Sequence, residues 1–129
     1  MAGDPSLFLA ARLELAASAV VPGRVLEYTV INTGALPIML GEAYGFERPA
    51  GDGWERVPVP YAFRLWGRRL ESGGRFELTA RVPELAHPGR YRLRKRLQVD
   101  RDPHPGYEWV AAREIEPIEV TAEFDVTVD

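Results

Sequence analysis

The sequence predicts an all-β protein, an antiparallel β-sandwich of about seven to eight strands. Apolar residues recur at every second position in several runs, as expected for strands buried on one face. Gly- or Pro-containing turn signals separate these runs. The 129 residues suit a single domain. We therefore expect an N-terminal tail over residues 1–6 and one sandwich domain over residues 7–129.

The expected strands follow from the alternation in each run. The clearest runs are residues 7–15, 24–32, 75–82, 88–97 and 121–129. In 75–82, for example, Phe76 and Leu78 alternate with Arg75 and Glu77. Turn residues occupy the intervals 21–23, 32–34, 49–53, 71–74, 87–89 and 102–106. The sequence contains no convincing helical pattern, so the domain is predicted to consist of strands and turns.

Composition excludes several classes of function. The formal net charge of −3 argues against a dedicated nucleic-acid-binding domain. The absence of cysteine excludes disulfides, thiolate catalysis and zinc sites built on cysteine. No stretch is apolar over the ~20 residues that a membrane span requires. The N-terminal segment lacks the basic region of a signal peptide, and Arg12 and Glu14 interrupt its apolar run. We expect a cytoplasmic protein, or the mature domain of an exported one.

The segment PGRYRLRKRL, residues 88–97, places an arginine at every second position. Alternation predicts that Tyr91 and Leu93 face the core, while Arg90, Arg92, Arg94 and Arg96 face solvent. In the last run, Glu123 and Asp125 occupy the polar face. If the two strands are neighbours, opposite charges pair across them, so we interpret the arginines as a compensated sheet face and not as a nucleic-acid site. Lys95 falls on the inward side, and we expect it near the end of the sheet with its ammonium group in water.

Residues 24–98, together with the last strand at 118–129, resemble bacterial immunoglobulin-like (Ig-like) domains. The matching positions are Asn32, Gly41, Tyr44, Glu47, Trp54, Val57 and Pro58, followed by a leucine, a glycine turn and the pattern PGxYR. A weaker likeness links the chain to bacterial intracellular proteinase inhibitors. The resemblance implies an Ig-like sandwich but no activity, because the family is largely of unknown function. Ser72 departs from the family pattern, which favours proline there, and residues 99–117 are longer than the family suggests.

Five residues are assigned structural roles: Pro88, Gly89, Tyr91, Leu93 and Trp54. Tyr91 follows a Pro-Gly turn near the start of its strand, which is the setting of a tyrosine corner, where the hydroxyl binds upstream backbone. Leu93 takes the position at which disulfide-bonded Ig domains carry a cysteine. Trp54 belongs to the family pattern, which suggests that it packs in the fold.

The segment VDRDPHPGYEW contains the only local group of potential metal ligands: Asp100, Asp102, His104 and Glu108. Oxygen ligands at alternate positions are found in calcium loops. However, the segment lacks the full calcium-loop pattern, two prolines restrict it, and Arg101 adds a positive charge. We interpret the segment as a proline-stiffened hairpin tip, and we predict neither a metal nor a cofactor.

The sequence offers little for catalysis, because its three serines lack a nucleophile motif and no glycine-rich phosphate loop is present. We predict no enzyme activity. The predicted function is a non-catalytic interaction or accessory module that binds a protein partner or a second copy of itself. Its candidate interaction surface comprises Asp102, His104, Tyr107 and Trp109. The alternative is a protease-inhibitor-like or glycan-binding sandwich that uses the 99–117 hairpin.

Overall fold

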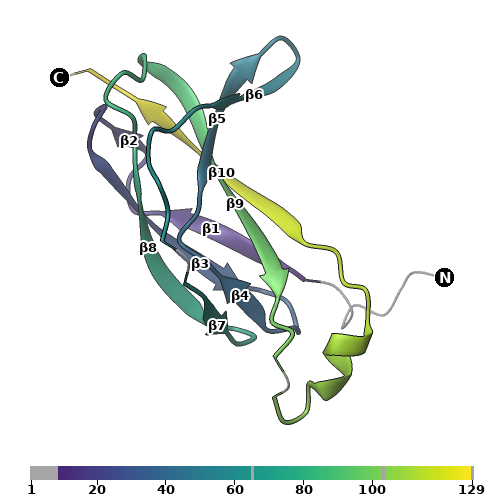
Figure 1. The fold of residues 1–129 in the computed structure, drawn as a ribbon. Helices are drawn as coiled ribbons and strands as arrows, with labels where there is room; N and C mark the ends of the chain where they lie inside the picture. The colour runs from purple at the N-terminus through teal and green to yellow at the C-terminus, as the bar shows by residue number, and fades with distance from the viewer. Residues whose placement is uncertain (1–8, 65, 103, 129) are drawn as a thin grey trace.

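The computed structural model describes residues 9–64, 66–102 and 104–128, which form two β-sheets packed face to face (Figure 1). All strand pairs but one are antiparallel. The predicted all-β sandwich is therefore confirmed. The proposed tail at 1–6 lies outside the described residues. Among those that are described, no helix is long and apolar enough to cross a membrane.

The smaller sheet contains three strands in the order β1-β3-β8. These are β1 (Ala11–Leu15), β3 (Val25–Asn32) and β8 (Arg75–Arg81). Because side chains alternate between the faces of a strand, Leu26, Tyr28 and Val30 of β3 are buried in the core. Glu27 is exposed on the opposite face. The period-two pattern in the sequence thus identifies both the strands and their buried faces.

The larger sheet is organised around β9 (Gly89–Val99). β10 (Ile118–Val126) pairs with β9 along one side over its full length. On the other side, β5 (Gly45–Ala50) pairs with the first half of β9, and β4 (Ile38–Leu40) pairs with its last two residues. The outer strands are β2 (Ala19–Val20), β6 (Gly53–Val57) and β7 (Arg68–Leu70), which pair with β10, β5 and β4 respectively.

A break in the sheet separates β4 from β5 and is filled by Lys95. β5 pairs with β9 as far as Arg94, and β4 pairs with it from Gln98 onward, so residues 41–44 leave the ladder between them. Lys95 lies opposite this break and is only 1% exposed. Its ammonium group donates hydrogen bonds to the carbonyl oxygens of Gly41 and Ala43, the latter at 2.7 Å. The expectation that Lys95 reaches water at the end of the sheet is wrong, because these carbonyls take the place of water.

The start of β9 has the geometry of a tyrosine corner. The Tyr91 hydroxyl donates a hydrogen bond of 2.8 Å to the carbonyl oxygen of His87, four residues upstream. The Tyr91 ring is buried and stacks on Phe124 of β10 at 6.1 Å between ring centroids. Gly89, at a φ of 144°, lies in a backbone region that side chains disfavour. Leu93 is fully buried beside them, so apolar packing joins the sheets here.

Candidate functional site

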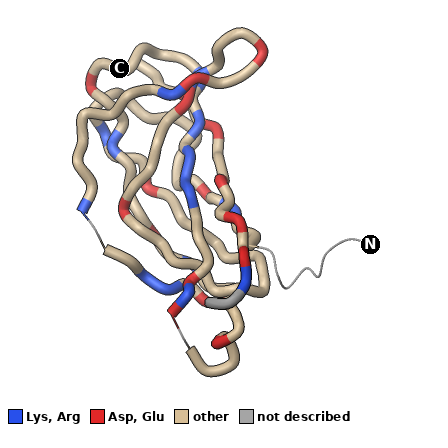
Figure 2. The backbone as a smooth tube through the Cα atoms, turned by 45° about the vertical axis from the view of Figure 1, so that its right-hand side comes forward, with Lys and Arg blue, Asp and Glu red and all other residues tan. Residues whose placement is uncertain are grey.

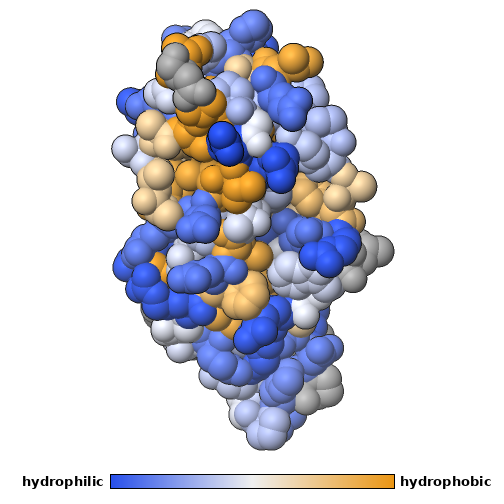
Figure 3. All heavy atoms as spheres, turned by 90° about the vertical axis from the view of Figure 1, so that its left-hand side faces the viewer, coloured by the Kyte–Doolittle hydropathy of each residue, from blue (hydrophilic) through white to orange (hydrophobic). Residues whose placement is uncertain are grey.

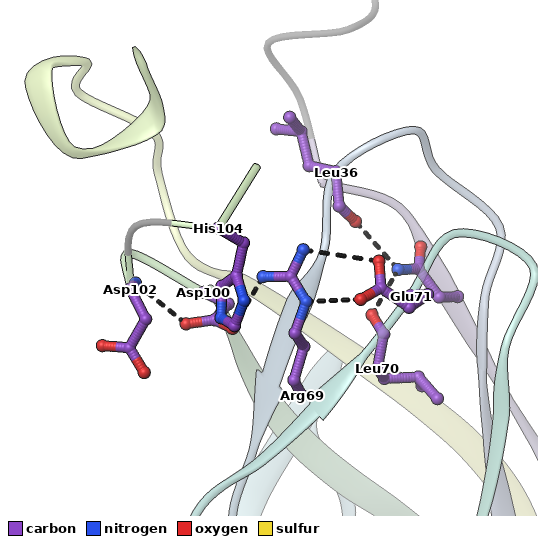
Figure 4. Close-up of polar contacts among 8 residues, drawn as sticks. Leu36, Arg69, Leu70, Glu71, Asp100, Asp102 and His104 are labelled. Carbon is purple, nitrogen blue, oxygen red and sulfur yellow. Dashed lines mark hydrogen bonds and ion pairs between the residues drawn. The ribbon is translucent and has the colours of Figure 1, made fainter. Parts of the chain in front are cut away.

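The connection between β9 and β10, residues 100–117, begins with a buried ionic network (Figure 4). Asp100 is 1% exposed and accepts a hydrogen bond of 2.8 Å from Nη1 of Arg69, on β7. The Arg69 guanidinium also binds Glu71, so it lies between two carboxylates. The other Asp100 oxygen accepts the amide N–H of Asp102 at 3.0 Å. The network ties the start of the connection to the edge of the larger sheet.

The electrostatics of Asp100 reflect two opposed effects. Burial raises the pKa of the carboxyl group, because desolvation disfavours its charged form. The hydrogen bonds from Arg69 and from the Asp102 amide outweigh burial, so the net result is a lowered pKa. Asp100 is therefore held as a carboxylate at neutral pH, and its role is to position the chain.

Asp100, Asp102 and His104 can offer ligand atoms that all lie within 4.8 Å of one another. The Nε2 atom of His104 is 3.3 Å from Oδ2 of Asp100. That same oxygen already binds the guanidinium of Arg69 at 2.8 Å, and a metal ion would have to displace this cation. The arrangement thus fits an ion-pair network better than a metal centre, since buried carboxylates need a charge partner and Arg69 supplies one.

The remainder of the connection is a folded loop containing a 3-10 helix, Glu108–Ala112, and not the stiff hairpin tip that the sequence suggests. Val110 and Ile115 are buried in the core of the sandwich. Nη1 of Arg101 donates to the carbonyl oxygens of Val110 (3.2 Å) and Arg113 (2.8 Å). Because the Val110 carbonyl oxygen also accepts the N–H of Arg113 at 3.1 Å, Arg101 adds a second bond at the end of the short helix and ties it to the start of the connection. No helical pattern was expected here, because a single 3-10 turn is too short to produce one.

The two aromatic residues of the connection have different surroundings. Tyr107 is half-buried, packs against the core and lies under the Arg69 guanidinium, 5.2 Å from its ring centroid. Trp109 is 38% exposed, and its indole N–H donates to the carbonyl oxygen of Gly106. His104 is also partly exposed, and Asp102 is exposed. The structure therefore brings Asp102 and His104 to the ionic network, places Tyr107 beneath it, and leaves Trp109 on the surface.

Trp54 occupies a different environment from the one expected for a packing residue. It lies on β6, half-buried, on the outer face of the larger sheet. The guanidinium of Arg92 covers its ring at 4.4 Å from the centroid. A cation–π contact of this kind contributes about 0.5–1 kcal/mol at exposed sites. Trp54 therefore packs on the sheet surface and not in the core.

The arginines of β9 run beside acidic residues of the neighbouring strands (Figure 2). Arg90 is 3.2 Å from a carboxylate oxygen of Asp125, on β10, and 3.6 Å from one of Glu123. Arg92 binds Glu47, on β5, at 2.6 Å. Arg94 binds Glu119, on β10, at 2.7 Å. Most of the predicted compensation is thus present, but Glu47 contributes to it from a strand that the sequence did not place beside β9.

Large hydrophobic side chains exposed in the described part of the chain are few: Val25, Leu85, Trp109 and Val128. The face drawn in Figure 3 shows hydrophobic groups mainly in its upper half, mixed with hydrophilic ones. Of the four residues, only Trp109 lies in the 100–117 connection. Among the described residues of the connection, Trp109 is therefore the one large hydrophobic side chain that is exposed to solvent.

A groove of about 580 Å³ lies over the β1-β3-β8 sheet, bordered by Trp66 and Phe76. Among its acidic residues, Glu14 binds Arg12 and Arg75, which contribute to lowering its pKa. Glu42 is paired with Arg64 at 3.6 Å. Because the carboxylates of Glu14 and Glu42 already have charge partners, they are not free to bind a positively charged ligand in the groove.

Sequence reasoning missed the partners of three residues that organise these sites. The burial of the Lys95 ammonium group was missed because an inward-facing lysine was expected to lie at the end of the sheet. Arg69 gave no signal, because its partner Asp100 is 31 residues away in the chain. Asn32, a position of the family resemblance, is buried and binds the carbonyl oxygens of Leu36 and Leu70 at 2.8 and 3.0 Å. Long-range partners of this kind have no signature in a single sequence.

Comparisons with known proteins address the fold. A family model described as a bacterial Ig-like domain matches residues 10–125. No curated protein matches the chain. Among solved structures, the chain is similar to the crystal structure of Spo0M, a sporulation control protein from Bacillus subtilis, with 14% identity and a TM-score of 0.43. That similarity covers 93% of this chain but 49% of the other, so the chain spans about half the length of Spo0M.

Proposed function

Because the chain belongs to the bacterial Ig-like domain family, we propose that it is a non-catalytic interaction module that binds a protein partner through the 100–117 connection. The observation that carries this proposal is the exposed Trp109 on a loop that is anchored in the core by Val110 and Ile115. Exposed aromatic residues that enter a partner's pocket dominate the energetics of many protein interfaces. The function is thus assigned to a surface and not to a catalytic centre.

The anchoring of the loop supports this role. Val110 follows Trp109 directly and is buried, and Arg101 holds the carbonyl oxygens of Val110 and Arg113. The N–H of Asp100 donates to the carbonyl oxygen of Pro37 at 3.0 Å. A loop that is ordered before binding loses less conformational entropy in the complex. Trp109 is therefore presented in a defined position.

The charges around Trp109 indicate the chemistry of the partner. Exposed acidic residues of the connection are Asp102, Glu108, Glu114 and Glu116. The basic residues of the connection are Arg101, whose guanidinium binds backbone carbonyls, and the exposed Arg113. Complementary charge at an interface rim increases association rates and selects partners. The best-fitting partner surface is an apolar pocket with basic residues at its rim.

The glycan-binding and inhibitor alternatives receive less support. A flat glycan platform needs neighbouring exposed aromatic rings, whereas Tyr107 packs under Arg69 and leaves Trp109 alone on the surface. An inhibitory loop that binds as an extended strand would conflict with the 3-10 helix at Glu108–Ala112. Both alternatives remain outcomes of the test below.

The test combines site-specific cross-linking with affinity measurement. A photo-cross-linking amino acid at position 109 should capture a partner in cells of the source organism, whereas one at Leu85, which is 91% exposed and lies outside the connection, should not. With the purified partner, Trp109→Ala should weaken binding at least tenfold, and the matched control Leu85→Ala should leave it unchanged. Unchanged affinity of Trp109→Ala would contradict the proposal. Saturable binding of glycans, or inhibition of a protease, would replace the protein partner with one of the alternatives.

A further inference from the structure

The outer face of the larger sheet carries more arginines than carboxylates. Four strands, β5, β6, β9 and β10, contribute to this face. Its positively charged residues are Arg56, Arg90, Arg92, Arg94 and Arg96, and its negatively charged residues are Glu47, Glu119, Glu123 and Asp125. Since each carboxylate is engaged by one or two arginines, some guanidinium groups are left without a partner.

The two arginines left over are Arg56 and Arg96. In the register of the sheet, Glu47 lies opposite both Arg56 and Arg92, but its carboxylate binds Arg92 at 2.6 Å and lies 3.9 Å from Nε of Arg94. Glu119 lies opposite Arg96, but it binds Arg94.

Within residues 9–64, 66–102 and 104–128, neither Arg56 nor Arg96 forms an ion pair. The carboxylates opposite them in the ladder are held by other arginines. Compensation of the arginine row is therefore complete near Arg90 and incomplete near Arg96.

A cavity of about 270 Å³ lies between these unpaired groups. It is lined by Ala43, Tyr44, Gly45, Arg56, Arg94, Arg96 and Glu119. Gly45 keeps the cavity open beside Arg94, because a β-carbon there would lie 3.2 Å from Nη2 of that arginine.

One wall of the cavity is fixed from inside the protein. The Ala43 carbonyl oxygen is held by the buried ammonium group of Lys95 at 2.7 Å. The break in the sheet that buries Lys95 therefore also shapes the depression on the outer face.

We propose that this cavity binds a phosphate dianion, either free or as the phosphate group of a small monoester. Three guanidinium groups and one carboxylate line it, which leaves an excess of two positive charges. A phosphate monoester carries −1.5 to −2 charges near neutral pH. Guanidinium groups bind phosphate oxygens through paired, charge-assisted hydrogen bonds. The cavity combines the right charge with donors from two strands, Arg56 on β6 and Arg94 and Arg96 on β9.

Titration of the full chain with inorganic phosphate and with glucose 6-phosphate tests the proposal. Arginine Nε–H resonances are followed by NMR, with ionic strength held constant by chloride. Both probes should give saturable shifts at millimolar concentration, and tighter binding of one probe identifies the source of the phosphate. Binding of glucose 6-phosphate should weaken below pH 6, where a phosphate monoester loses its second charge.

Matched arginine variants on the same face of the sheet separate a specific site from a general salt effect. Arg96→Gln and Arg56→Gln should each weaken binding roughly tenfold or more, because each removes a charge-assisted hydrogen bond. Arg90→Gln, whose arginine is engaged by Asp125 and Glu123, should leave binding unchanged. All three positions are exposed, so the variants should fold. Absence of saturation, or equal losses in Arg90→Gln and Arg96→Gln, would overturn the proposal.

Discussion

Lys95 and Asp100 are two buried charges only five residues apart, and the protein stabilises them differently. Each is 1% exposed. Asp100 has a counter-ion, the guanidinium of Arg69 at 2.8 Å. Lys95 binds two neutral carbonyl oxygens, and its ammonium group lies 5.9 Å from the ring centroid of Tyr28. One buried charge is thus paired with a charge of opposite sign, and the other is bound only by backbone carbonyl groups.

The two environments shift the pKa values of these groups in ways that have opposite consequences for stability. Burial lowers the pKa of Lys95 to about 8, and the attraction of Glu42, which acts in the opposite sense, does not offset it. For Asp100, burial raises the pKa, but the hydrogen bonds from Arg69 and from the Asp102 amide lower it by more, so the net shift is downward. Folding therefore disfavours the charged lysine and favours the charged aspartate. Each charge can be tested through its own pH range.

Removal of Asp100 should produce the largest effect. Asp100→Ala leaves the largely buried Arg69 with only Glu71, which is exposed, so we expect a loss of about 3–5 kcal/mol in the free energy of unfolding. In the wild type, the stability that ionised Asp100 contributes should be lost as the pH falls below the ordinary carboxyl range. The reason is that the pKa of Asp100 is lower in the folded protein than in the unfolded chain, so the unfolded chain takes up the proton first. Urea denaturation measures both. Asp102→Ala, at an exposed neighbour, is the control, and equal losses in the two variants would refute the ion-pair account.

The effect of the buried Lys95 on stability should appear at alkaline pH. Between pH 8 and 10.5 the unfolded chain holds a proton on Lys95 that the folded protein has lost, so stability should rise with pH. The full rise is about 3 kcal/mol for a shift of this size. The buried Tyr28 acts in the opposite sense above pH 10, because burial raises its pKa.

The difference between the wild type and Lys95→Met isolates the lysine from Tyr28. Denaturant midpoints across the alkaline range give the measurement. If the denaturant midpoints of the wild type and of Lys95→Met change with pH in parallel, the claim that burial lowers the pKa of Lys95 is wrong.

The sequence predicted the fold better than either buried charge. Period-two alternation identified β3, β8, β9 and β10 and the inward side of each, because alternation is a local property. It also placed Lys95 inward, but the two carbonyl groups that bind it come from residues more than 50 positions earlier. Likewise, Asp100 was recognised as a possible ligand, whereas its partner Arg69 was not. The positions that depend on contacts distant in sequence were the ones that sequence analysis could not assign.

Loss of a neutral hydrogen bond on β9 should have an effect on stability of intermediate size. Tyr91→Phe removes the bond from the tyrosine hydroxyl to the His87 carbonyl oxygen, and we expect a loss of about 1 kcal/mol. Thermal denaturation measures it against Tyr61→Phe, whose hydroxyl has no hydrogen-bond partner among the described residues. Identical melting temperatures for Tyr91→Phe and the wild type would exclude a stabilising tyrosine corner.

The smallest effect is expected for an exposed charge on β9. Arg90 and Asp125 are about half exposed, and solvent weakens their attraction. Arg90→Gln should therefore reduce stability by less than about 1 kcal/mol. The loss should shrink further in high salt, which screens exposed ion pairs. A loss as large as that of Asp100→Ala would mean that burial does not distinguish these charges.

The most direct test of the buried lysine is a titration of its side chain. Lys95 is the only lysine of the chain, so a protein labelled with ¹³C-lysine gives a single Cε resonance without assignment. The account predicts a midpoint near pH 8 in the folded protein, moving to the ordinary lysine value on unfolding in urea. A midpoint at or above 10.5 in the folded state would show that the ammonium group is in water, and would contradict its role in closing the break between β4 and β5.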